Sequence, residues 1–247
     1  MLDGRVKTLH PLVHGGLLAR RADPEHMRQA AAHGIGMIDL VAVNLYPFER
    51  TVIAKQTMGE AGTDHEIIEM IDIGGPAMIR SASKNFHDVV VLVDPKDYEP
   101  VLSEIASVGG VSLATRARLA ASAFAHTASY DAAIADWMAR HVAPGAPAMK
   151  ADFPDVLTLG FRKERDLRYG ENPHQAAALY RAPLDTSPSA VAAEQMQGKE
   201  LSYNNILDLD AAWSLAREFT PPACAIIKHT NPAGAALGGG PAEAWRS

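Results

Sequence analysis

The sequence has one cysteine and no long apolar run. Cys224 stands alone, so the chain can form neither an internal disulfide nor a zinc site built on several cysteines. No stretch approaches the ~20 apolar residues of a membrane-spanning helix, and the first residues lack the apolar core of a secretion signal. These absences predict a soluble protein of the reducing cytoplasm that is not exported.

Basic residues are also in the minority, with 23 Lys and Arg against 29 Asp and Glu and a formal net charge of −6. This balance argues against a protein that attracts nucleic acid or acidic membranes over its whole surface, and it leaves only local anion pockets. Hydrophobic residues make up 47% and charged residues 21%, which is typical of globular proteins. At ~150 residues per domain, the length predicts one to two domains.

Strand-like and helix-like segments alternate in the first part of the chain. The short apolar runs at 38–43 and 89–93 are typical of strands buried on both faces of a parallel sheet. Asp23-Pro24 has the pattern of a helix start, and Gly34 ends that helix. Further helices are predicted at 64–70, 76–83 and 112–141, the last with packing positions at Leu119, Ala123, Phe124, Ile134 and Met138. The alternation predicts an α/β fold.

Residues 142–151 hold two prolines and a glycine without periodicity, which predicts a linker and divides the chain into domains at 1–150 and 151–247. Beyond the linker we expect strands at 156–161, 176–180 and 223–227, a surface excursion at 186–194 and a helix at 207–219. No further element is predicted to cover the last strand. Residues 5–11 already have the composition of a functional loop, although a βα domain would normally have a strand ahead of it. This loop and the uncovered last strand favour a piece of a longer protein.

Two cations and a hydroxyl lie close together near the start of the chain. In an extended segment Arg5 and Lys7 project on one face and suit a phosphate or carboxylate, with Thr8 beside them. A solvated basic loop is the alternative. His10 and His14 lack a third ligand, so packed or hydrogen-bonded histidines are favoured over a zinc site.

Polar residues also follow the first predicted strand and a glycine turn. Asn44 and Tyr46 come directly after the strand, where ligands of α/β proteins bind, although a turn with an aromatic plug is the alternative. Asp72 precedes Ile73, Gly74 and Gly75 at a helix start, whose amides can attract an anion, and Lys84 follows on that helix. A carboxylate and an amine in one pocket could transfer protons, but Asp-x-Gly-Gly is often a plain turn.

Two further motifs lie past the linker. The segment 168–175, RYGENPHQ, packs a cation, an amide, an imidazole and an aromatic ring into one turn. Lys228 and His229 follow the last predicted strand, where an ammonium can stabilise an oxyanion and a neutral imidazole can accept a proton. An isolated pair of this kind is more often a surface feature.

Taken in order, RVKTLHP, NLYPF, IDIGG with RSASKN, RYGENPHQ and KHTNPAG resemble the bifunctional purine-biosynthesis family that joins AICAR transformylase to IMP cyclohydrolase. The resemblance also includes SYNNILDLDAAW at 202–213. It implies that residues 1–150 form most of a cyclohydrolase domain, a methylglyoxal-synthase-like parallel sheet flanked by helices. Residues 151–247 would be the start of a second α/β domain, the cytidine-deaminase-like transformylase.

For the first domain, the resemblance implies closure of formyl-AICAR to IMP with loss of water. Its catalytic residues would be Lys84, the proton-transfer group, together with Lys7, Tyr46 and Asp72. Nucleotide-binding positions would be Arg5, Val6, Thr8, Asn44, Ile73, Gly74 and Gly75. No metal and no tightly bound cofactor is implied.

For the second domain, the resemblance implies transfer of a formyl group from the co-substrate 10-formyltetrahydrofolate to the 5-amino group of AICAR. His229 would be the proton-transfer residue and Lys228 the oxyanion-stabilising one. Arg168, Tyr169 and Asn205 would bind AICAR.

The resemblance further implies a homodimer of a longer, cytoplasmic parent enzyme. The family has a segment ahead of Arg5 that holds the nucleotide phosphate, and a much longer transformylase domain, so we expect little or no activity from these 247 residues alone. A non-catalytic nucleotide-binding regulatory module is the alternative, and an interaction fragment using the helix at 112–141 is another. The joint presence of Asp72 and Lys84 favours the enzyme, because a phosphate site alone requires neither.

Overall fold

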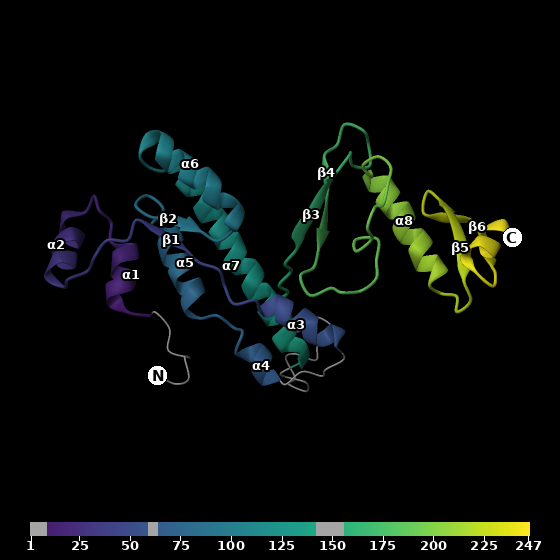
Figure 1. Ribbon diagram of the computed structural model, residues 1–247, viewed down its shortest axis with the longest axis horizontal. Coiled ribbons are helices and arrows are strands. Elements are labelled where there is room, and N and C mark those ends of the chain that lie inside the picture. The colour runs from purple at the N-terminus through teal and green to yellow at the C-terminus, as the bar shows by residue number, and fades with distance from the viewer. Residues whose placement is uncertain (1–8, 59–63, 142–155) are drawn as a thin grey trace. The chain divides into compact units, whose positions relative to one another are not determined.

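The structure is a computed structural model of the chain, and it describes residues 9–58, 64–141 and 156–247 (Figure 1). The chain divides into two compact units, residues 1–160 and 161–247, which are described separately. The predicted linker at 142–151 lies outside the described residues. Within the described ranges, none of the helices has both the length and the apolar character needed to cross a membrane.

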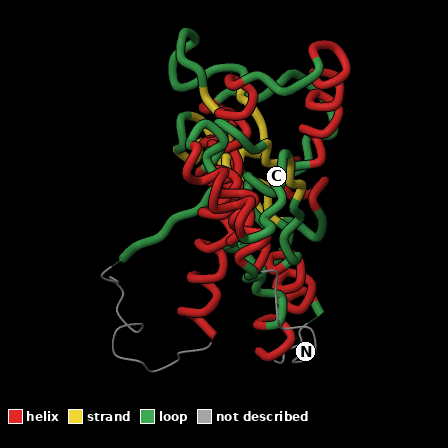
Figure 2. Tube along the Cα trace, turned by 90° about the vertical axis from the view of Figure 1, so that its left-hand side faces the viewer, coloured by secondary structure: helices red, strands yellow, loops and turns green. Residues whose placement is uncertain are grey.

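The first unit combines helices with a small parallel sheet, and this confirms the predicted α/β class (Figures 1 and 2). Its elements in chain order are α1 (Pro11–Leu18), α2 (Pro24–Ala32), β1 (Leu40–Ala42), α3 (Phe48–Thr57), α4 (Asp64–Ile68), α5 (Gly74–Lys84), β2 (Val90–Leu92), the short 3-10 helix η2 (Pro95–Asp97), α6 (Tyr98–Val108) and α7 (Leu113–His141).

The two strands pair in parallel, with Leu40 opposite Val90 and Ala42 opposite Leu92. Every residue of β2 is buried, because α5 and α7 both pack against this strand. The prediction of burial on both faces is wrong for β1, since Leu40 is 38% exposed. Among the described residues β1 pairs with β2 alone, so its other edge has no partner strand there.

Local capping explains the helix ends that the sequence predicts, and one helix that it was not expected to form. The Asp23 carboxylate accepts hydrogen bonds from the first amides of α2, and Gly34 follows the helix with a φ of +63°. At α1, which was not predicted, the Leu12 amide donates to Nδ1 of His10 and proline occupies the first turn.

The long helix α7 turns a different stripe to the core from the predicted one. Leu119 and Ala123 are buried as expected, but Phe124 is 38% exposed and lies under the guanidinium of Arg80, 5.5 Å from the ring centroid. Buried positions on a helix recur about every 3.6 residues, and from Leu119 this spacing leads through Ala123 to Thr127 and Tyr130, not to Phe124. The buried residues farther along α7 are Thr127, Tyr130, Ala132, Ala133 and Trp137.

The second unit is built from two antiparallel hairpins and a helix between them. Its elements are β3 (Arg162–Leu167), β4 (Ala177–Arg181), α8 (Tyr203–Ala216), β5 (Ala223–Lys228), β6 (Asn231–Leu237) and α9 (Pro241–Arg246). The strand predicted at 156–161 is wrong: β3 begins at Arg162, and the apolar side chain of Val156 is 78% exposed. The charged segment Arg162–Leu167 forms the strand instead, because it pairs with β4 and its Glu164 forms an ion pair with Arg181.

One more expectation for this unit needs correction, that nothing covers the last predicted strand. The last predicted strand, β5, pairs with β6, and α9 packs on this hairpin with Ala244 buried. Neither β6 nor α9 was predicted, because the glycines at 238–240 between them indicated irregular structure. The excursion predicted at 186–194 is mostly exposed, as expected, and it contacts α8 where the Trp213 ring nitrogen donates to the Pro188 carbonyl oxygen and Ala190 is buried.

The core contribution of α7 can be tested at one leucine. Replacing buried Leu119 by alanine is expected to lower the free energy of unfolding of the first unit by about 2–5 kcal/mol, through lost burial and a residual cavity. The matched change Leu113→Ala, at a 46%-exposed position on the same helix, should cost less than about 0.5 kcal/mol. Urea unfolding followed by Trp137 fluorescence, with Trp213 and Trp245 changed to Phe, measures both. Equal losses would contradict the packing described.

Candidate functional site

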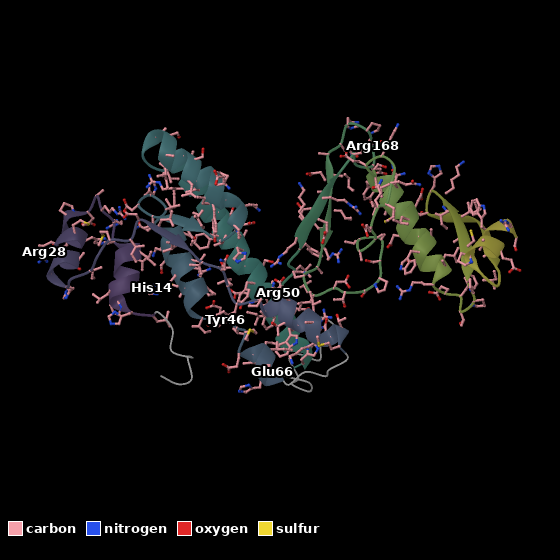
Figure 3. The ribbon with its side chains drawn as sticks, in the orientation of Figure 1. His14, Arg28, Tyr46, Arg50, Glu66 and Arg168 are labelled. Atoms are coloured by element: carbon pink, nitrogen blue, oxygen red, sulfur yellow. The ribbon has the colours of Figure 1, made fainter. Side chains whose placement is uncertain are left out.

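The segment after β1 turns sharply at a proline. Pro47 has φ −79° and ψ 57°, and the Phe48 amide donates to the Tyr46 carbonyl oxygen at 2.8 Å, which is an inverse γ-turn. The turn sends Phe48 into the core, where it is fully buried, and leaves Tyr46 41% exposed just ahead of α3 (Figure 3). The proline ring fixes this geometry because it restricts φ.

Asp72 joins this turn to the start of α5. One carboxylate oxygen, Oδ1, accepts a hydrogen bond from the Gly75 amide at 2.8 Å, and Oδ2 accepts from the Tyr46 amide at 3.4 Å. The two glycines, for which a plain turn was the alternative, are the first residues of the helix and are buried. Ile73 is the N-cap residue, and the Asp72 carboxylate just before it binds the Gly75 amide. The Gly75 amide is therefore occupied by Asp72 in this structure.

Tyr130 is a residue of this site that the sequence argument missed. From the middle of α7, its hydroxyl donates to the Met70 carbonyl oxygen at 2.8 Å and accepts from the Asp72 amide at 3.0 Å. Its ring meets Phe48 edge to face at a centroid distance of 6.2 Å. Burial raises the pKa of the Tyr130 hydroxyl above its usual value. A buried tyrosine hydroxyl usually has a polar partner, but the sequence did not show that Tyr130 is buried.

Lys84 lies at the opposite end of α5 from Asp72. Ten residues separate it from Gly74, which corresponds to about 15 Å along a helix axis, and its side chain is exposed. No hydrogen bond or ion pair joins Lys84 to Asp72 in the described part of the chain. The geometry therefore brings Tyr46, Asp72, Ile73, Gly74 and Gly75 together, and it gives Lys84 no direct contact with the Asp72 carboxylate.

The remaining first-unit candidates fall into two groups. The anion site predicted at Arg5, Val6, Lys7 and Thr8 lies outside the described residues. Asn44 is exposed between β1 and the proline turn. His10 caps α1, and Nδ1 of His14 lies 2.9 Å from the Ser81 hydroxyl oxygen. Among residues 9–58, 64–141 and 156–247, no cluster of three His, Cys, Asp or Glu side chains could hold a metal.

In the second unit, Arg168 and Tyr169 follow β3 and meet the start of α8. Arg168 is labelled in Figure 3. Its guanidinium lies over the Tyr169 ring, 4.9 Å from the centroid, and also donates to the Tyr169 hydroxyl at 3.3 Å. Hydrogen bonding with Ser202, and then Arg168, lowers the pKa of Tyr169. Asn205 completes a capping box in which its side-chain oxygen accepts from the Ser202 amide at 3.0 Å.

Lys228 and His229 lie at the tip of the β5–β6 hairpin. His229 and Thr230 both have positive φ, 51° and 61°, which a two-residue hairpin turn requires but which is unfavourable for a β-branched residue. The turn is held from α8, because Asp208 accepts a hydrogen bond from the Thr230 amide at 2.8 Å. The strained residue is therefore Thr230, next to the exposed His229, and backbone strain of this kind clusters at functional sites.

One helix therefore connects the two candidate groups of the second unit. The first turn of α8 contacts the segment of Arg168 and Tyr169, since the Tyr203 amide donates to the Tyr169 carbonyl oxygen at 3.0 Å. Asp208, six residues after Ser202 and about 9 Å farther along the axis, holds the turn of His229. One helix thus contacts both the segment of Arg168 and the turn of His229.

Gly75 provides a direct test of how tightly Asp72 is held. A Cβ atom at this position would lie 2.7 Å from both Asp72 Oδ2 and a methyl carbon of Leu45. Although alanine ordinarily stabilises a helix relative to glycine, Gly75→Ala is expected to destabilise the chain by about 1–3 kcal/mol. Gly36→Ala, where no atom lies within 4 Å, is the control and should change little. Stabilisation by Gly75→Ala in urea unfolding would refute the close approach.

The raised pKa of Tyr130 predicts a pH dependence of stability. The folded chain holds the hydroxyl proton more tightly than the unfolded chain, whose tyrosine titrates near pH 10, so this contribution is complete below pH 10 and is lost as pH rises further. Tyr130→Phe removes it. The unfolding free energy of the unsubstituted chain should therefore fall more steeply than that of the variant as pH rises above 10. If urea unfolding gave the same pH dependence of the unfolding free energy for both chains, the raised pKa of Tyr130 would be contradicted.

Comparison with known proteins places the chain in a family. A family model described as "AICARFT/IMPCHase bienzyme" matches residues 82–247. The "Bifunctional purine biosynthesis protein PurH" of Bacillus subtilis (strain 168) is 53% identical over 245 residues, which cover 99% of this chain and 46% of that protein. The protein of the same name from Acidithiobacillus ferrooxidans is 54% identical over 240 residues, 96% of this chain and 44% of that protein.

A solved structure, "Crystal structure of ForH", is 39% identical, with a TM-score of 0.45 over 55% of this chain and 67% of the other. The chain spans less than half the length of the curated relatives it matches. The family model covers well over half of the chain, namely residues 82–160 of the first unit and all of the second. The chain therefore belongs to the AICARFT/IMPCHase bienzyme family.

Proposed function

We propose that this chain carries parts of the two catalytic domains of a bifunctional enzyme for the last two steps of IMP synthesis. Residues 1–150 would be a methylglyoxal-synthase-like IMP cyclohydrolase domain without its N-terminal part, and residues 151–247 the start of a cytidine-deaminase-like AICAR transformylase domain. The observation that carries the proposal is the hydrogen bond from Tyr46 to Asp72, which brings two predicted catalytic residues from separate motifs into one site.

In ring closure, the carboxamide nitrogen of formyl-AICAR attacks the formyl carbon and water leaves. The reaction needs a proton acceptor at the nitrogen, stabilisation of charge at the formyl oxygen and a proton donor for the departing water. The Asp72 carboxylate, held by two backbone amides, is an oriented acceptor. Lys84 would act on the substrate separately from Asp72, because no contact joins the two side chains.

In formyl transfer, the 5-amino group of AICAR attacks the formyl group of 10-formyltetrahydrofolate. This amine is a weak nucleophile because its lone pair is delocalised, so a base must remove its proton as the bond forms. His229 is exposed at the hairpin tip and would be that base, with Lys228 next to it stabilising the oxyanion. Arg168 and Tyr169 at the start of α8 would bind AICAR, with Asn205.

The parent enzyme would be a cytoplasmic homodimer that binds AICAR and formyl-AICAR and uses no tightly bound cofactor. Phosphorylated substrates must bind an acidic chain through local cations, and Arg168 is one such cation in the described residues. These 247 residues alone would have little or no activity, because the relatives are more than twice as long.

A hybrid enzyme tests both activities together. In it, this chain replaces the matched region of the Bacillus subtilis relative, which supplies the flanking segments. The hybrid should close formyl-AICAR to IMP and transfer formyl groups to AICAR. Lys84→Ala should lower ring closure by about 10²-fold or more and spare formyl transfer, and His229→Ala should do the reverse, because general acid–base groups contribute 10²–10⁴-fold.

The reciprocal pattern is the internal control, since a misfolded hybrid would lose both activities at once. Ring closure that survives Lys84→Ala, or formyl transfer that survives His229→Ala, would refute the residue assignments. Nucleotide binding without any turnover would instead support a regulatory module.

A further inference from the structure

We propose that Tyr130 is a positioning residue for ring closure, whose hydroxyl fixes the backbone at Asp72 and thereby places the Asp72 carboxylate against the Tyr46 amide. The inference rests on the proposed cyclohydrolase function of the first unit. It adds a residue from α7 to a site otherwise formed by the segment after β1 and the start of α5.

Tyr130 is itself held in place by the core. Its side chain is only 4% exposed, and its ring packs against Phe48. Phe48 in turn meets Trp137 edge to face, with a centroid distance of 5.8 Å, two turns farther along α7. Because interiors are close-packed, this aromatic cluster leaves the Tyr130 ring little freedom. The hydroxyl is therefore a fixed point supplied by the longest helix of the chain.

The backbone that receives this hydroxyl lies between two helices. The Ile71 amide donates to the backbone carbonyl oxygen of Ile68, the last residue of α4. The next amide, that of Asp72, donates instead to a side chain, the Tyr130 hydroxyl oxygen. The same hydroxyl donates to the Met70 carbonyl oxygen. One phenol thus satisfies a backbone acceptor and a backbone donor two residues apart, and its loss would leave both without that partner.

The effect of the Tyr130 hydroxyl reaches the predicted catalytic groups through Asp72. The carboxylate accepts from the amides of Gly75 and Tyr46, so a shift of its backbone changes both distances. Phe48, which contacts the Tyr130 ring, is joined to Tyr46 through the proline turn. Both segments of the site therefore depend on the same side chain, one through its hydroxyl and one through its ring.

The same observations argue against a proton-transfer role for Tyr130. Its hydroxyl hydrogen is directed to the Met70 carbonyl oxygen, and its raised pKa keeps it protonated near neutral pH. Removing the hydroxyl should therefore lower the rate without moving the pH profile of ring closure, which a catalytic acid or base would shift.

The test compares two variants of the hybrid enzyme. Tyr130→Phe removes one oxygen and keeps the ring. We expect kcat for ring closure to fall about 10- to 100-fold, the scale of a small misplacement of catalytic groups, with KM, the pH profile and formyl transfer unchanged. Val101→Ala, in the core on α6 and outside the site, is the control that destabilises the same unit. It should leave kcat unchanged at temperatures where the hybrid stays folded.

Equal kcat values for Tyr130→Phe and the unsubstituted hybrid, or equal losses in Tyr130→Phe and Val101→Ala, would overturn the positioning role while leaving the proposed function intact. A hybrid that never closes the ring would instead overturn the proposed function and the role of Tyr130 with it.

A second measurement uses the chain itself and requires no turnover. In amide NMR spectra, Tyr130→Phe should shift the Asp72, Gly75 and Tyr46 resonances, and Val101→Ala should not. Unchanged resonances for all three amides would show that the hydroxyl does not position Asp72.

Discussion

The candidate cyclohydrolase site depends on one buried hydroxyl. Tyr130 donates to Met70 and accepts from Asp72, and the Asp72 carboxylate then accepts from the amides of Gly75 and Tyr46. A short chain of hydrogen bonds thus connects α7, the start of α5 and the turn after β1. Because buried polar groups are costly without partners, each bond in this chain supports the next. The polar site is built on the apolar packing of α7 against the core.

The second unit uses a helix in the same way. The first turn of α8 meets the segment of Arg168 and Tyr169, and Asp208 holds the strained turn that presents His229. Tyr46, Asp72 and His229 lie on short connections, and the groups that hold them include Tyr130 on α7 and Asp208 on α8; Lys84 and Lys228 are instead the last residues of α5 and β5. This division is common in proteins, where rigid elements position functional loops.

Periodicity and capping predicted the α/β class, the two parallel strands and the helices α2, α4, α5 and α7 of the first unit, because these signals are local. The motifs also gave the candidate residues. The sequence could not give the role of Tyr130, since nothing local indicates that a residue on an alanine-rich helix meets a backbone 58 positions away. Pairing partners were equally non-local: the charged segment of β3 forms a strand only because β4 lies opposite, and β6 pairs despite its proline and glycine.

The central claim, that the hydroxyl of Tyr130 and the carboxylate of Asp72 lock the site, is tested most directly by amide hydrogen exchange at single residues. In the unsubstituted chain, the amides of Asp72 and Gly75 donate to side chains only, so local opening of this connection would expose them at once. We expect protection comparable to that of the Val90 amide in the buried strand β2, which donates to the Asp39 carbonyl oxygen. Exchange at the rate of an open loop would contradict it.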